Sequence, residues 1–170
     1  KRAAARAAFG GFAYAGQSCI SVQRIFAQKD CYEEFKKLLL EETAKVKVGA
    51  VTEKGVIVGP MIDSGNADRV LAWVDEAVKA GGKLLAGGKR TGDTITPVVI
   101  EGAPHSTKVC SEEVFAPIVV LEKFDTVDDA IRLVNDSKFG LQAGVFTDSQ
   151  ATIRKCISEI EAGGIVVNEV

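Results

Sequence analysis

The uninterrupted apolar run Ile118-Val119-Val120-Leu121 indicates the fold of this chain. A strand with one exposed face alternates apolar and polar residues, whereas a strand buried on both faces reads as a continuous run of aliphatic side chains. Strands of the second kind occur in parallel sheets that helices cover on both sides. The run therefore predicts a central strand of an α/β protein.

The residues that follow this run alternate between strand and helix patterns. In chain order they are a strand at 118–121, a helix capped by Asp125 or Thr126 with Val127, Ala130, Ile131 and Val134 facing inward, a strand at 144–146, a helix lined by Ile153, Cys156, Ile157 and Ile160, and a strand at 165–167. Strands joined by helices with short links predict two right-handed crossovers and a mainly parallel sheet.

The part of the chain before residue 118 also contains both helix and strand patterns. Its predicted elements are a helix over residues 1–15 ended by Gly16, a strand at 22–27, a helix from Asp30 to about Lys47, a loop at 48–62, a helix capped by Asp63 or Ser64 with a stripe of Ala67, Val70, Leu71, Val74, Ala77 and Val78, and strands at 83–86 and 96–101. We therefore expect one α/β domain over residues 1–170, with a mainly parallel sheet flanked by helices.

Composition narrows the class of protein. The 170 residues are 46% hydrophobic and 26% charged, which is typical of a globular domain. A net charge of −2 provides no basic field for nucleic acid, and no apolar run is long enough for a membrane span. The four cysteines lack metal or disulfide spacing and there is one histidine, so we expect no metal and a cytoplasmic protein with reduced thiols.

Cys19 is the candidate nucleophile. It lies in Gly16-Gln17-Ser18-Cys19, between the predicted first helix and the first strand. Most free cysteines are inert members of the core. A loop between regular elements instead brings a thiol close to backbone N–H groups, which favour the reactive thiolate.

Three stretches resemble the aldehyde dehydrogenase superfamily. Gly16-Gln17-Ser18-Cys19 with Arg24 is similar to the nucleophile signature of that family. Residues 111–117, Ser-Glu-Glu-Val-Phe-Ala-Pro, are similar to its Glu-Glu-aliphatic-Phe-Gly-Pro motif, and residues 135–147 are similar to the segment that follows it. The resemblance extends over nearly the whole chain.

The resemblance implies a function for particular residues. In the family, the thiolate that matches Cys19 attacks the aldehyde carbon, the thiohemiacetal loses a hydride to NAD or NADP, and water hydrolyses the thioester. The resemblance assigns Glu113 to the ribose of the nicotinamide half of the cofactor and Phe115 to packing near the nicotinamide. Ala116 stands where the family usually has Gly, and we expect the added methyl group to shift the local backbone. For Arg24 we expect a structural ion pair.

The family's other parts have no match in this chain. There is no G-x-G-x-x-G fingerprint, so we expect the cofactor-binding domain, the general base and the oxyanion-hole amide to belong to a longer protein from which this segment is cut. The segment alone is expected to be inactive. The resemblance also implies a small aldehyde substrate and a homo-oligomer for the full-length protein, and it weakly favours hydroxy or semialdehyde substrates.

Two alternatives remain open at the level of sequence. His105 lies in a polar turn, and it can pair with Cys19 as a thiol hydrolase, because such partners are adjacent in space and not in sequence. The other alternative is a non-catalytic α/β interaction module in which all four cysteines are structural.

Overall fold

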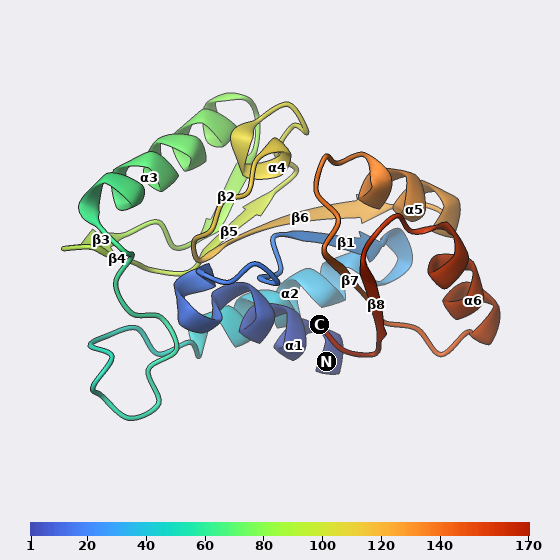
Figure 1. Cartoon of the computed structure of the whole chain (residues 1–170), viewed down its shortest axis with the longest axis horizontal. Helices are drawn as coiled ribbons and strands as arrows, with labels where there is room; N and C mark the ends of the chain where they lie inside the picture. The colour runs from blue at the N-terminus through green and yellow to red at the C-terminus, as the bar shows by residue number, and fades with distance from the viewer.

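The computed structural model describes residues 1–170 and consists of helices packed on a mixed, mainly parallel sheet (Figure 1). Its helices are α1 (Arg2–Phe12), α2 (Tyr32–Ala44), α3 (Ser64–Lys79), α4 (Lys108–Ser111), α5 (Val127–Asn135) and α6 (Gln150–Glu159), with short 3-10 turns η1 (Ala13–Gly16) and η2 (Lys29–Cys31). Its strands are β1 (Arg24–Gln28), β2 (Lys83–Ala86), β3 (Arg90–Thr91), β4 (Thr94–Ile95), β5 (Val98–Glu101), β6 (Ile118–Phe124), β7 (Gln142–Val145) and β8 (Gly164–Val167). The α/β class predicted from the sequence is confirmed.

The central sheet has the strand order β1-β6-β5-β2. Strand β6 pairs in parallel with β1 on one side and with β5 on the other, while β2 runs antiparallel to β5. The predicted central position of residues 118–121 is therefore confirmed.

Alternating residues of the two inner strands build two separate cores. Val98, Ile100, Ile118 and Val120 pack in the core that contains α3 and α4. Val99, Val119 and Leu121 pack in the core that contains α1 and α2. Figure 1 shows these two helix pairs on opposite faces of the sheet. Burial on both faces explains why the sequence of β6 begins with four apolar residues in succession.

Helix α1 lies unusually close to the sheet. A Cβ atom added to Gly11 would be 2.4 Å from the Cγ1 atom of Val119 on β6, so the backbone approach requires glycine. The glycines that weaken the end of this helix in isolation therefore permit its packing. The regular helix ends at Phe12, earlier than predicted, because Tyr14 and Ala15 have left-handed backbone conformations.

Helix ends agree with the sequence where a side chain caps them. Asp63 accepts a hydrogen bond from the N–H of Asn66, and Thr126 forms a capping box with Asp129, as expected for α3 and α5. The predicted capping by Asp30 is wrong, since Asp30 belongs to a 3-10 turn and α2 starts only at Tyr32. Val78, predicted in the apolar stripe of α3, is 40% exposed.

The C-terminal strands depart from the predicted topology. Strands β7 and β8 pair in parallel, as expected, but they form a separate two-stranded sheet and do not join β6. Both sides of β6 are already occupied by β1 and β5, so β7 has no edge of that strand to join. Sequence periodicity identified the strands but gave no information about which neighbours they choose.

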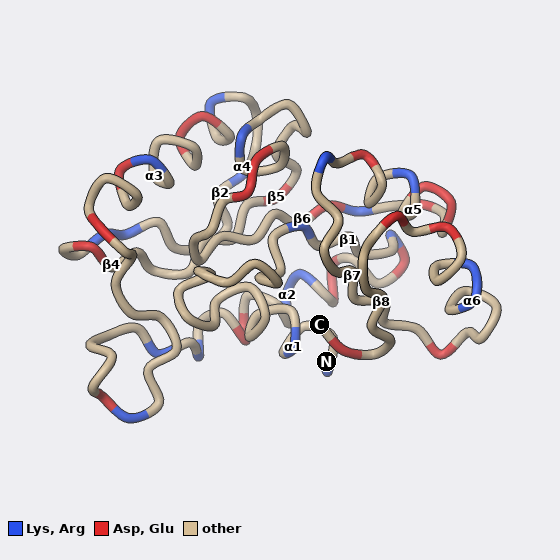
Figure 2. The backbone as a smooth tube through the Cα atoms, in the orientation of Figure 1, with Lys and Arg blue, Asp and Glu red and all other residues tan.

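Residues 48–62 form a long connection with only one isolated bridge, between Val48 and Val58. Acidic and basic residues are interspersed over the surface (Figure 2). The stretch from Gly10 to Gln23 contains no charged residue. No helix combines the length and the apolar character that crossing a bilayer requires.

Candidate active site

The loop that carries Cys19 begins with a sharp reversal of the backbone. Tyr14, Ala15 and Gly16 have φ angles of 54°, 57° and 65°. Left-handed conformations are unfavourable for residues with a side chain, and they persist only where the surroundings impose them. This reversal takes the chain out of α1 and directs it towards β1 through the turn that contains Cys19.

Cys19 is exposed and has no partner. The N–H of Ser21 donates to the carbonyl of Ser18 at 3.0 Å and closes a turn around Cys19. Neither the Sγ atom nor the peptide N–H of Cys19 forms a hydrogen bond within the chain. The thiol is therefore accessible to a small electrophile, and the adjacent N–H is free to donate to an oxygen that develops negative charge.

Polar side chains hold this turn from both ends. Gln17 accepts a hydrogen bond from the N–H of Ile62 at 2.8 Å and donates to the carbonyl of Pro60 at 3.3 Å. Ser21 Oγ lies 3.3 Å from each of the carbonyl oxygens of Gly10 and Gly11. These contacts fix the Cys19 turn to the long connection on one side and to α1 on the other.

The second candidate segment places Glu113 and Phe115 at the surface. Both residues are exposed, while Val114 and Ala116 between and after them are buried. Phe115 has a φ of 51°, a left-handed conformation that is strained for a residue with a side chain. Ala116 itself has no left-handed conformation, so the methyl group that replaces the family's usual glycine adds no strain of that kind.

The two segments are in direct backbone contact. A Cβ atom added to Gly16 would lie 2.0 Å from the carbonyl oxygen of Ala116. Gly16 is three residues before Cys19, and Ala116 is three residues after Glu113. The structure thus brings the Cys19 loop and the Glu113 segment together, although they are far apart in the sequence.

Two residues that anchor the Glu113 segment were not recognised from the sequence. Arg69 of α3 donates to the carbonyl of Val114 at 2.9 Å, and its guanidinium lies over the Trp73 ring at 4.5 Å from the ring centre. Gln23, directly before β1, hydrogen-bonds to the backbone on both sides of Glu113. The only sequence signal for Gln23 was its closeness to Cys19, and no local pattern indicated Arg69.

Several apolar side chains on the segments that meet at the Cys19 loop are exposed to solvent. Tyr14 is 81% exposed and Ile62 is 78% exposed, and Ile20 and Phe115 are also exposed. Gln17 connects the loop that carries Tyr14 to the segment that carries Ile62, because it hydrogen-bonds to the backbone of Pro60 and Ile62. Exposed apolar side chains that lie close together are typical of a surface that a ligand or another part of a protein covers.

His105 does not pair with Cys19. Its Nε2 atom is 2.6 Å from the Oε2 atom of Glu122, and its Nδ1 atom is 3.6 Å from the Oδ2 atom of Asp136. It lines a hollow with Arg24 and Cys110, and Cys19 is not part of that hollow. The hypothesis of a Cys19–His105 hydrolase is therefore not supported, because the histidine is engaged elsewhere.

Arg24 has partners of an unexpected kind. Instead of an ion pair, its guanidinium donates to the carbonyl of Leu133 at 2.7 Å, near the C-terminal end of α5, and lies over the Phe26 ring. The negative end of a helix attracts a cation in the same way as a carboxylate does. The expected ion pair is wrong, and Arg24 connects β1 to α5.

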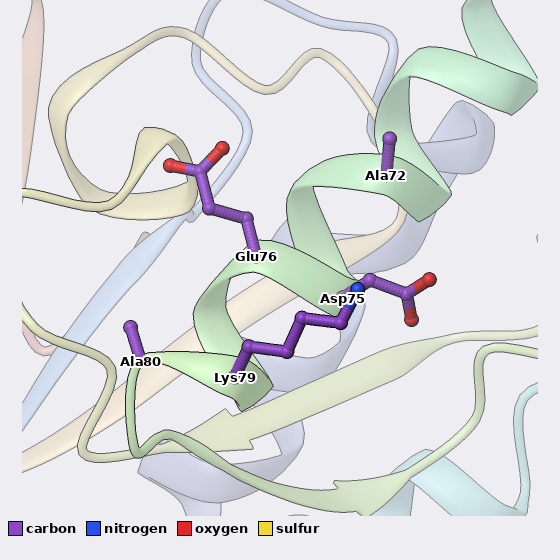
Figure 3. Close-up of a pocket in the computed structure, with 5 residues that line it drawn as sticks. All are labelled: Ala72, Asp75, Glu76, Lys79 and Ala80. Carbon is purple, nitrogen blue, oxygen red and sulfur yellow. The ribbon is translucent and has the colours of Figure 1, made fainter.

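A second hollow lies beside the C-terminal half of α3 (Figure 3). Its walls are Ala72, Asp75, Glu76, Lys79 and Ala80. Glu76 is already paired with Lys108 at 3.1 Å, and the hollow contains no nucleophile. No group of three or more His, Cys, Asp or Glu residues is arranged to hold a metal ion. The candidate site therefore remains the Cys19 turn with the Glu113 segment.

The residues of the candidate site suit one end of a dinucleotide. The exposed carboxylate of Glu113 can accept hydrogen bonds from two ribose hydroxyls, and the exposed ring of Phe115 provides an apolar surface for a flat heterocycle. The chain offers no glycine-rich turn before a helix for the pyrophosphate. The fit is therefore limited to the nicotinamide half of such a cofactor.

Comparison with known families agrees with this architecture. The model of the aldehyde dehydrogenase family matches residues 1–170, and the chain belongs to this family. It is 44% identical over 158 residues to 3-sulfolactaldehyde dehydrogenase from Priestia aryabhattai, a match that covers 93% of this chain and 33% of the relative. The chain thus spans about a third of the length of the curated relatives that it matches.

Solved structures give the same result. Aldehyde dehydrogenase 21 from Physcomitrella patens, in complex with its reaction product succinate, matches with a TM-score of 0.95 and 37% identity, over 98% of this chain and 34% of that one. Glyceraldehyde-3-phosphate dehydrogenase from Methanocaldococcus jannaschii, complexed with NADP, matches with a TM-score of 0.94 and 30% identity, over 99% of this chain and 36% of that one.

Proposed function

We propose that this chain is the nucleophile-bearing domain of a longer enzyme that oxidises an aldehyde to a carboxylic acid with NAD or NADP. The observation that carries this proposal is the exposed Cys19, on a strained loop in backbone contact with the segment that presents Glu113 and Phe115. Membership of the aldehyde dehydrogenase family supports the same reaction.

Cys19 is the proposed nucleophile. Its Sγ atom adds to the aldehyde carbon, and the resulting thiohemiacetal carries an oxyanion to which the free N–H of Cys19 donates. Loss of a hydride converts this species to a thioester, which water cleaves to the acid and the free thiol. The general base for the water and a second oxyanion donor are proposed to come from the rest of the enzyme.

Glu113 and Phe115 are the proposed cofactor contacts. The Glu113 carboxylate accepts hydrogen bonds from ribose, and the Phe115 ring packs near the nicotinamide. When bound, the nicotinamide supplies the acceptor for the hydride. Because these contacts concern only one end of the dinucleotide, a separate cofactor-binding domain is proposed as the main source of affinity.

The proposed substrate is a short aldehyde with an anionic group. Among the relatives, one is named for a sulfonated aldehyde and one for a phosphorylated aldehyde, and a third is bound to its dicarboxylic acid product, succinate. The stretch from Gly10 to Gln23 has no carboxylate that would repel such a substrate from Cys19. A neutral hydroxyaldehyde is the second candidate, supported by the small and polar neighbours Ser18 and Ser21.

We propose further copies of the same protein as partners and the cytoplasm as its compartment. Phe139, Leu141 and Ile157 are each at least half exposed, and a homo-oligomer or the cofactor-binding domain would bury such groups. All four cysteines are free, as in a reducing compartment.

The reaction is tested with the full-length protein. Formation of the reduced nicotinamide is followed by absorbance with aldehydes that carry a sulfonate, a carboxylate, a phosphate or a hydroxyl group, and with matched uncharged aldehydes. We expect a higher kcat/KM for the anionic group, with the carboxylic acid as product. Turnover of an ester or amide without the dinucleotide, and none of an aldehyde with it, would overturn the proposal in favour of a hydrolase.

A further inference from the structure

Gln23 connects the Cys19 turn to the Glu113 segment through a single side-chain amide. Its Nε2 atom donates to the carbonyl of Glu112 at 2.8 Å and to that of Val109 at 2.9 Å. Its Oε1 atom accepts from the N–H of Val114 at 3.0 Å. Both hydrogens of the amide group and its oxygen are therefore engaged.

These bonds restrain Glu113 from both sides. The Glu112 carbonyl belongs to the peptide group that precedes Glu113, and the Val114 N–H belongs to the peptide group that follows it. One amide thus fixes the orientation of both peptide planes that meet at the Cα atom of Glu113, and so the direction in which its carboxylate leaves the backbone. The Glu113 side chain itself is exposed and forms no hydrogen bond within the chain that could orient it.

The base of this arrangement is rigid. The carbonyl of Gln23 accepts from the N–H of Val120 on β6 at 2.8 Å, where the ladder between β1 and β6 begins. Gln23 lies four residues after Cys19, so the segment that leads from the Cys19 turn into β1 also holds the Glu113 segment. A fixed support of this kind is what precise placement of a binding group requires.

We propose that Gln23 is a positioning residue that sets the orientation of Glu113 towards the dinucleotide. This inference rests on the proposed function of Glu113 as a cofactor contact. A side chain at this position must both donate and accept, which excludes Met and most other residues of similar length. Asn has the required groups but is one methylene group shorter, so it does not reach both peptide planes.

The test uses the full-length protein and Gln23→Met, which keeps the length of the side chain and removes its hydrogen bonds. We expect the KM for the dinucleotide to rise about tenfold, with the KM for the aldehyde nearly unchanged. The melting temperature should fall by a few degrees, because three backbone groups lose their hydrogen-bond partner. Gln28→Met is the matched control, because Gln28 ends β1, the strand that Gln23 directly precedes, and its side chain hydrogen-bonds only to Asp30, at 3.5 Å. An effect of equal size in both variants would overturn the inference.

A double-variant cycle separates positioning from simple support of the fold. If Gln23 acts through Glu113, Gln23→Met adds little to the KM for the dinucleotide in a Glu113→Gln background. A further tenfold rise in that background would contradict the inference. If Gln23→Met does not fold, Gln23→Glu takes its place: its carboxylate still accepts from Val114 but faces two carbonyls, so a larger rise is expected.

The same measurements distinguish failure of the inference from failure of the proposed function. An unchanged KM in Gln23→Met, together with a raised KM in Glu113→Gln, overturns the inference alone. An unchanged KM in Glu113→Gln removes the cofactor contact itself and overturns both.

Discussion

Cys19 and Cys31 are the two exposed thiols of this chain, and their surroundings differ in every respect that matters for reactivity. Cys19 lies in an uncharged turn after a left-handed reversal of the backbone, and its Sγ atom has no partner. Cys31 lies next to Asp30 at the start of α2, and its thiol donates to the carbonyl of Gln28 at 3.4 Å. Exposure alone therefore does not mark a nucleophile.

The elements around the two thiols also serve different purposes. Next to Cys31, the Tyr32 hydroxyl donates to Glu101 at 2.9 Å and Lys36 Nζ lies 2.8 Å from the same carboxylate, which connects α2 to β5. Around Cys19, strained backbone and exposed apolar side chains are held by the uncharged side chains of Gln17 and Ser21, and the turn contains no charged residue. The first region stabilises the fold, whereas the second is held in a costly conformation of the kind that clusters at functional sites.

The largest expected difference between the two regions is catalytic. In the full-length protein, Cys19→Ser is expected to lower kcat for aldehyde oxidation by at least about a thousandfold, because a hydroxyl is a far weaker nucleophile than a thiolate. Cys31→Ser should leave kcat within about twofold, since Cys31 has no proposed catalytic function. Steady-state kinetics of the two variants check this, and comparable losses in both would remove the distinction.

The contact between the Cys19 loop and the Glu113 segment is tested by Gly16→Ala. The added methyl group meets the backbone oxygen of Ala116 at 2.0 Å on a left-handed φ, so we expect a loss of about 3 kcal/mol in the free energy of unfolding. Gly55 provides the control, because it has a φ of 80° and nothing lies within 4 Å of an added Cβ atom. Urea unfolding should show a clearly smaller loss for Gly55→Ala, and equal losses would mean that the contact does not exist.

Glu113→Gln tests whether Glu113 contributes to cofactor binding and not to the reactivity of Cys19. The amide keeps the shape of the carboxylate but loses its charge, and hydrogen bonds to charged groups contribute about 1.5–3 kcal/mol. We expect the KM for the dinucleotide to rise about tenfold or more in the full-length protein, while the rate of Cys19 alkylation stays the same. An unchanged KM together with an unchanged rate of hydride transfer would contradict the assignment.

The smallest effect concerns the network beside Cys31. The hydrogen bond from Lys36, with a further one from Tyr32, lowers the pKa of the Glu101 carboxyl. A carboxyl with a lowered pKa stabilises the fold above its unfolded pKa of about 4.3, and this contribution disappears as the pH falls through its folded pKa. We expect Glu101→Gln to cost about 1 kcal/mol at neutral pH and progressively less below pH of about 4, by urea unfolding. A cost that does not vary with pH would contradict this.

The sequence predicted those parts of the molecule that depend on local patterns. Examples are the continuous apolar run of β6, the apolar stripe of α3 and the capping of α3 by Asp63. Burial and capping depend on residue types at neighbouring positions, so a single sequence is enough to predict them. The separate pairing of β7 and β8 was not identified, because it depends on β1 and β5 occupying both sides of β6, which is a property of the whole chain.

The candidate site was predicted to a similar extent. The motifs gave Cys19, Glu113 and Phe115, and the structure places their two segments in contact. The residues that support them remained hidden, since Gln23 bonds to groups 86 to 91 positions away and Arg69 to one 45 positions away. Long-range hydrogen bonds of this kind leave no periodic signal in a single sequence.

Competitive alkylation of the four thiols tests the central claim most directly. Burial raises the pKa of the Cys110 and Cys156 thiols, which keeps them protonated at neutral pH, so the decisive comparison is Cys19 against Cys31. The chain is treated with limiting iodoacetamide at neutral pH, and the adducts are mapped by mass spectrometry. The account predicts that Cys19 is labelled first; earlier labelling of Cys31, or of either buried thiol, would contradict it.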